Sequence, residues 1–139
     1  MTDTITIILP GTIRSKKNSR EPRYAKTKTG KLIKFMGASK KYRAWEARAR
    51  QAAKALLREI GTTGPLDGEY RLEVKAYMKG PLLDMDAAHT AVQDALEGIV
   101  WKNDKQVKRY SEESGVWRDK MYPRTEVVIT RLENDAIRE

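Results

Sequence analysis

The 139-residue sequence contains no cysteine, and its only histidine is His89. The absence of cysteine excludes disulfide bonds, thiolate zinc sites and a cysteine nucleophile. A single histidine argues against a histidine-rich site for a transition metal. No apolar run approaches the roughly 20 residues of a membrane-spanning helix, and the first residues lack the basic and apolar regions of a signal peptide. We therefore expect one domain, spanning residues 1–139, in a reducing cytoplasm.

Positive charge is concentrated in residues 14–43. The chain has a formal net charge of +9, and this stretch holds twelve of its 28 lysines and arginines but one of its 19 acidic residues, Glu21. The rest of the chain carries 16 basic and 18 acidic residues, so the whole excess lies in this stretch. Dense basic runs bind nucleic acid more often than not, although a solubilising tail or a solvated face has the same composition. Tyr24 and Phe35 could stack on exposed bases.

Residue patterning predicts an α/β (α+β) fold, with a small mixed sheet of about four strands and two main helices packed on it. Alternation and β-branched residues favour strands at residues 4–9, 70–78, 107–117 and 125–132. Apolar residues at helical spacing predict helices from the N-cap Ser39 to about Gly61 and over residues 86–97, before Gly98. Residues 13–37 show no period, which predicts a long, mobile basic loop with a turn at residues 28–31.

Three aspartates, Asp84, Asp86 and Asp104, form the candidate chemical site. Acids clustered in a basic protein are understandable if they hold a cation, and hard cations such as Mg²⁺ bind carboxylate oxygens. If the segment is extended, Asp84 and Asp86 project to the same side. A simpler interpretation is that Asp86 starts the helix, because aspartate is a favoured N-cap. An Asp-x-Asp pattern also arises easily by chance.

The chain can return from the helix to bring Asp104 beside the other two acids. The helix at residues 86–97 is about 17 Å long, and the chain from Glu97 to Asp104 can extend to about 23 Å. Trp101, flanked by Ile99 and Val100, should pin this segment to the core.

His89 and Asp94 follow Asp86 by one and two helical turns, so both could border the same site. For His89 we favour a plain helix-flank position with a hydrogen bond to a neighbour, because a lone histidine is seldom a metal ligand. Asp94 is a candidate to support the metal-binding carboxylates without binding the metal itself.

Several motifs, in order and at compatible spacing, resemble the RusA family of Holliday-junction resolvases. The acidic ones are Asp84-Met85-Asp86, Asp94-Ala95-Leu96 and the Val-Trp-Lys-Asn-Asp-Lys-Gln-Val of residues 100–107. The others are Leu9-Pro10, the basic residues 15–20 and the helix start at residues 39–42. The resemblance covers most of the chain, and its acidic motifs are more specific than its basic one.

The resemblance implies a homodimeric endonuclease of bacteria or their phages that nicks four-way DNA junctions with Mg²⁺, or Mn²⁺ as a substitute. Carried over by position, the metal-binding and catalytic acids are Asp84, Asp86 and Asp104. Two positions depart from the family pattern: Ala87 replaces a frequent asparagine, and Thr90 replaces a catalytically important lysine. The candidate replacements for that lysine are Lys79, Lys102 and Lys105.

We therefore predict a Mg²⁺-dependent endodeoxyribonuclease that resolves Holliday junctions in recombination and repair, as a homodimer without membrane contact. The residues expected to bind the DNA backbone are Lys16, Lys17, Arg20, Arg23, Lys40 and Lys41. The alternative is a non-catalytic nucleic-acid-binding protein, or a degenerate junction binder, in which the acids only cap a helix and balance charge.

Overall fold

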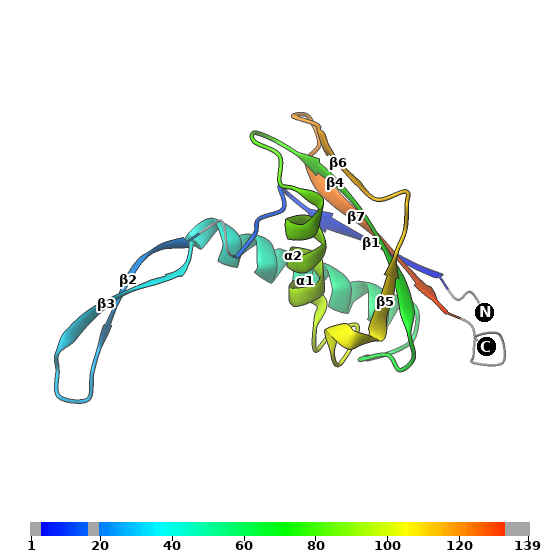
Figure 1. Cartoon of the computed structure of the whole chain (residues 1–139). Helices are drawn as coiled ribbons and strands as arrows, with labels where there is room; N and C mark the ends of the chain where they lie inside the picture. The colour runs from blue at the N-terminus through cyan, green and yellow to red at the C-terminus, as the bar shows by residue number, and fades with distance from the viewer. Residues whose placement is uncertain (1–3, 17–19, 133–139) are drawn as a thin grey trace.

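The computed structural model describes residues 4–16 and 20–132, which form two α-helices, a five-stranded mixed sheet and a separate two-stranded sheet (Figure 1). The α+β fold class is thus confirmed, although the strands outnumber the four expected. In chain order the elements are β1 (Thr4–Pro10), β2 (Arg20–Lys26), β3 (Leu32–Ala38), α1 (Lys40–Glu59), β4 (Tyr70–Met78), α2 (Met85–Leu96), the 3-10 helix η1 (Asp104–Gln106), β5 (Val107–Tyr110), β6 (Gly115–Arg118) and β7 (Arg124–Arg131).

The main sheet has the order β1-β7-β4-β5, and β6 pairs with β4 on the same edge as β5. β7 is antiparallel to both β1 and β4, whereas β5 and β6 are parallel to β4. The single strand expected at residues 107–117 is wrong, because the polar residues 111–114 form a turn that divides it into β5 and β6. One edge of β4 therefore pairs with two short strands, β5 and β6, at different points along its length.

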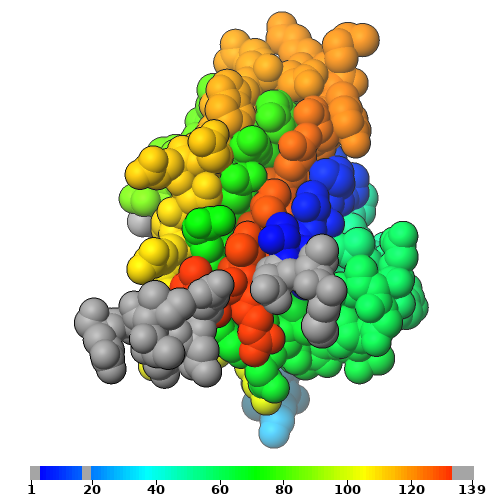
Figure 2. Space-filling model, turned by 90° about the vertical axis from the view of Figure 1, so that its right-hand side faces the viewer, coloured from blue at the N-terminus to red at the C-terminus, as the bar shows by residue number. Residues whose placement is uncertain are grey.

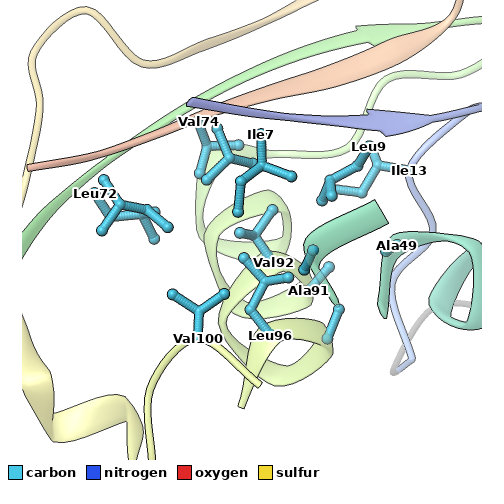
Figure 3. Close-up of a cluster of buried hydrophobic side chains, with 14 of the residues drawn as sticks. Ile7, Leu9, Ile13, Ala49, Leu72, Val74, Ala91, Val92, Leu96 and Val100 are labelled. Carbon is cyan, nitrogen blue, oxygen red and sulfur yellow. The ribbon is translucent and has the colours of Figure 1, made fainter. Parts of the chain in front are cut away.

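The helices cover one face of the main sheet and enclose the core. Along β4, Leu72, Val74 and Ala76 alternate with partly exposed residues and are fully buried against the helices. Figure 3 shows the Leu72 and Val74 side chains meeting those of β1, α1 and α2, and the 99–101 segment closes the cluster. No helix of the described residues lies over the opposite face of the sheet, which faces the viewer in Figure 2.

The first helix starts and ends where the sequence predicts. Ser39 is the N-cap, and its hydroxyl accepts a hydrogen bond from the Tyr42 N–H at 3.1 Å. The helix ends at the C-cap Ile60, after which Gly61 adopts a φ of +87° that favours glycine. Tyr42 and Trp45, two aromatic residues on the apolar side of this helix, are buried and belong to the core.

Residues 20–38, expected to be part of an aperiodic loop, form the antiparallel ribbon of β2 and β3 (the basic arm), which projects away from the body in Figure 1. The expected turn is present: the Thr27 N–H donates to the Lys31 carbonyl at 2.8 Å, and Gly30 has a φ of +84°. Periodicity failed to predict the ribbon because both of its faces are largely exposed. The mobility of this segment stays a prediction.

Candidate functional site

The candidate site begins at the N-terminus of α2. Asp84 is the N-cap, and its Oδ1 accepts a hydrogen bond from the Ala87 N–H at 2.8 Å. Asp86 lies within the first turn, so the expectation that Asp86 caps the helix is wrong by two residues. The extended arrangement considered for the pair is not formed, because Met85 is already helical. Both carboxylates are exposed at the positive end of the helix dipole, which stabilises negative charge.

A capping network holds Asp104 at the start of η1. The Asn103 side chain accepts a hydrogen bond from the Lys105 N–H at 2.8 Å, and Gln106 Oε1 accepts one from the Asn103 N–H at 3.3 Å. Gln106 Nε2 in turn donates to the Leu66 carbonyl at 2.9 Å. The Asn-x-x-Gln spacing is a capping box, a signal in the sequence that our predictions did not use.

The segment from Glu97 to Asp104 is folded rather than extended. The Gly98 N–H donates to the Trp101 carbonyl at 2.7 Å, which closes a tight turn directly after α2. Trp101 is fully buried, and its Nε1 donates to the Gln93 carbonyl at 3.3 Å, which confirms that it pins this segment. As a result η1 lies near the last turn of α2 in Figure 1, whereas Asp84 and Asp86 lie at the first turn.

Tyr110, at the end of β5, contacts α2 and is influenced by acids on two separate elements, Asp86 on α2 and Asp104 on η1. Its ring stacks on His89 with 3.8 Å between centroids, and its hydroxyl donates to Gln93 Oε1 at 2.6 Å. Burial raises the pKa of Tyr110, and the charges of Asp86 and Asp104 raise it further. The negative charges of Asp86 and Asp104 therefore both influence the ionisation of the Tyr110 hydroxyl. The sequence did not predict a role for Tyr110, because a single aromatic residue at a strand end carries no distinctive pattern.

His89 is buried beside the acids, and its Nδ1 makes the expected helix-flank hydrogen bond, to the Met85 carbonyl at 2.9 Å. Its Nε2 has no partner among the described residues. Burial lowers the pKa of His89 from its usual 6.5, although the bond to Met85 and the charge of Asp86 oppose this effect. The imidazole is therefore neutral at pH 7.

This lowered pKa predicts a pH-dependent stability. As the pH falls below 6.5, the unfolded chain gains a proton at His89 that the folded protein does not accept, so the stability present above 6.5 is lost. Between about pH 7.5 and 6.0 the free energy of unfolding should fall by up to about 0.8 kcal/mol. Urea titrations followed by circular dichroism would measure this change. In a His89→Gln variant the decrease should disappear; an equal decrease in the variant would assign it to other groups.

A cavity of about 360 Å³ lies where the base of the basic arm meets the outer face of α2. It is lined by Ser15, Lys16, Arg20, Gly37, Ala38, Thr90, Ala91 and Asp94. Burial, Glu97, Asp104 and Glu46 raise the pKa of Asp94, whereas Lys16 lowers it. Lys16 and Arg20 are the two basic residues that line the same cavity as Thr90. Of the candidate replacements for the family lysine, Lys102 instead lies 3.7 Å from a carboxylate oxygen of Asp67.

The other residues expected to bind DNA lie on or near the arm. Arg23 is on β2, next to Gly37 on the facing strand. Lys40 and Lys41 are exposed in the first turn of α1, and the Lys40 N–H donates to Glu21 Oε1 at 2.9 Å. Lys17 lies outside the described residues. The arm therefore presents its basic side chains on a defined ribbon, which is a shape that the major groove of DNA can admit.

Among the described residues, no three His, Asp or Glu side chains come close enough together to hold a metal ion. Asp84, Asp86 and Asp104 are nevertheless exposed carboxylates, the donor type that Mg²⁺ prefers. Proteins commonly hold Mg²⁺ with one or two carboxylates, completed by water and substrate phosphates. The residues present therefore fit this ion in donor chemistry. Their grouping into one site stays a prediction.

The site thus combines a basic arm with a neighbouring helix whose first residues include two exposed acids. A model of the family described as endodeoxyribonuclease RusA matches residues 10–130. The chain therefore belongs to the RusA endodeoxyribonuclease family, which confirms the resemblance. No curated protein matches the sequence. Among the described residues, no helix combines the length and the apolar character that crossing a membrane requires.

Proposed function

We propose that this chain is a Mg²⁺-dependent endodeoxyribonuclease that resolves Holliday junctions in the recombination and repair of bacterial or phage DNA. The family match carries the proposal. The cavity between the arm and α2 supports it, because two basic residues, Lys16 and Arg20, adjoin the helix that bears the acids. Phosphate-binding and metal-binding side chains are then neighbours, as phosphodiester hydrolysis requires.

In this mechanism each group of residues has a separate task. Asp84, Asp86 and Asp104 would hold Mg²⁺, with Mn²⁺ as a substitute. When bound, the ion supplies an activated water and neutralises charge on the phosphate. Lys16 and Arg20 would hold the DNA phosphate at the cavity, and the arm would bind the backbone without reading bases. Asp94, on the same helix, would support the metal-binding carboxylates without binding the ion itself.

We also propose that the active form is a homodimer. A four-way junction is close to two-fold symmetric, and a two-fold dimer presents two identical sites. Paired nicks on opposite strands then follow from one binding event.

A junction binder that does not cut is the second candidate. Two observations favour it: the described residues contain no group of three acids ready for a metal, and Thr90 stands where the family often has lysine. In that case the Asp84 carboxylate serves only as the N-cap of α2.

The deciding experiment uses a four-way DNA junction labelled on one strand. The purified protein should nick it when Mg²⁺ is added and should only bind it in the presence of a chelator. A linear duplex of the same sequence is the control and should not be cut. Tight binding without nicks in either Mg²⁺ or Mn²⁺ would reject the nuclease and leave the second candidate.

The basic arm should supply affinity through its charge. Lys26, Lys28, Lys31 and Lys34 are exposed on the arm, so changing all four to glutamine should weaken junction binding. For every phosphate that the arm no longer neutralises, the slope of log affinity against log salt should also decrease by about 0.9. Titrations at several salt concentrations measure the slope. The same change at Lys54 and Arg58, exposed on α1, is the control; a slope that changes in the control and not in the arm variant would place the phosphate-binding residues elsewhere.

A further inference from the structure

Four side chains form a continuous stack across the face of the main sheet that no described helix covers. Trp117 on β6 lies directly opposite Tyr77 on β4, and Tyr77 lies opposite Arg124 on β7. The rings of Trp117 and Tyr77 stack with 5.4 Å between centroids and 23° between planes. The Arg124 guanidinium lies 4.0 Å from the centre of the Tyr77 ring and 4.5 Å from that of Tyr122. We call these four residues the stacked row.

The middle of the stacked row is held in place by its neighbours. Arg124 Nε donates to Glu126 at 2.8 Å, and Nη1 donates to Asp119 at 3.2 Å. The Asp119 carboxylate also accepts the N–H of Tyr122 at 3.0 Å, which orders the loop that carries this ring. At the other end the indole of Trp117 lies across Gly115, where any Cβ would overlap it. The rings are therefore ordered before any partner arrives.

The two ends of the stacked row remain open to solvent. Trp117 is 43% exposed and Tyr122 is 57% exposed, whereas the other two tryptophans, Trp45 and Trp101, are fully buried. Figure 2 shows this face, with the segment that carries β6 and the following loop at its upper end. Each end thus presents an aromatic surface on which a further flat ring could stack.

The charge beside the stacked row is positive. Lys79 and Lys120 are exposed and form no ion pair within the part of the chain that the structure describes. The two acids at the row, Asp119 and Glu126, are both paired with Arg124. A partner that combines flat rings with negative charge would satisfy both the aromatic ends and the two cations. Unpaired nucleotides have this combination.

We propose that the stacked row binds unpaired bases of single-stranded DNA, with Lys79 and Lys120 holding the adjoining phosphates. The inference deepens the proposed function, because a protein that acts on branched DNA meets unpaired nucleotides wherever strands exchange or a junction opens. It places this contact on the helix-free face of the sheet, away from the basic arm. A second copy of the chain is a poorer occupant, since a two-fold contact would bring the same cations together.

The test separates bases from phosphates. Labelled oligonucleotides of about 12 thymidines, and abasic strands of the same length, are titrated without metal and in a chelator, so the result does not depend on cleavage. The wild type should bind the thymidine strand more tightly than the abasic strand. It should also lose fluorescence from Trp117, its one exposed tryptophan. Equal affinity for the two strands would overturn the proposal.

Variants of the two exposed rings test the assignment of the bases to the stacked row. Trp117→Ala and Tyr122→Ala should each weaken thymidine binding by about fivefold or more and leave abasic binding unchanged. Trp117→Phe should keep most of the preference. Ile8→Ala, which removes a 42% exposed side chain from the same sheet face, is the matched control. Equal losses on both strands, or a preference that survives both alanine changes, would assign the row to folding alone.

Gly115→Ala offers a variant that removes no ring. The added Cβ overlaps the Trp117 indole and should displace it from the stack. Gly115 has no positive φ, so the backbone itself accepts alanine. This variant should lose the preference for thymidine as Trp117→Ala does, with its circular dichroism unchanged. A change in sedimentation of the ring variants at constant base preference would instead favour a second copy of the chain as the occupant.

Discussion

Asp86→Asn is expected to abolish Mg²⁺-dependent nicking of a four-way junction while leaving its binding intact or tighter. The change removes a carboxylate donor for the ion and also removes a negative charge that repels phosphate. Asp84→Asn should have the same effect, and the structure makes this variant informative. Asparagine is as good an N-cap as aspartate, so the variant keeps the cap of α2 and changes the charge alone. Asp84→Ala would in addition cost about 1 kcal/mol of stability.

Gel assays of nicking and of junction binding, made on the same preparations, measure both effects. Glu59→Gln, an exposed acid at the end of α1, is the matched control and should cut normally. Asp104→Asn should be as inactive as Asp84→Asn if the three acids act together. Normal cutting by a folded Asp104→Asn protein would show that the site consists of the α2 acids alone. Normal cutting by all three variants would remove these acids from the chemistry.

The largest expected effect on stability is that of Trp101→Ala. The side chain is fully buried between α2 and the 99–101 turn, and it donates a hydrogen bond to the Gln93 carbonyl. Removing a buried aromatic ring costs about 3–5 kcal/mol, a large part of the stability of a small protein. Urea unfolding followed by circular dichroism would measure the loss.

The neighbouring Lys102→Ala is the control for this prediction. Lys102 is exposed, and its ion pair with Asp67 is also exposed, so its loss should change the free energy of unfolding by no more than about 0.5 kcal/mol. Activity should fall in Trp101→Ala in proportion to the fraction unfolded. A Trp101→Ala protein as stable as the control would mean that the segment leading to Asp104 is held by other contacts.

The two helices were predictable because the sequence of each contains the local signals for where a helix starts, which side is buried and where it ends. In α1 a capping serine, apolar residues on one side and a glycine at the end agree with one another, and α2 was placed to within one residue at each end. The strands packed on the helices were predictable for a related reason. In β4 one face is buried and the other is not, so apolar and polar residues alternate along its sequence.

The structural features that were not predicted from the sequence have physical causes that no local pattern reveals. The arm is exposed on both faces, so burial imposes no alternation on β2 and β3. The division of residues 107–118 depends on β4, which pairs with β5 at one end and with β6 at the other. Asp84 and Asp86 are equally good caps by type, and only the register of the helix decides between them. Tyr110 owes its position to contacts with α2, which are tertiary.

The basic arm has a consequence for how the protein could adapt to DNA of different shapes. Its base lines the cavity next to α2, whereas its tip projects away from the body. Deleting one residue pair next to the turn would shorten the arm by about 3.4 Å and leave the cavity lining as it is. Under the proposed function, the reach of the arm along a DNA branch and the phosphate contacts at the cavity would thus be set by different ends of one ribbon. Either property can change during evolution without altering the other.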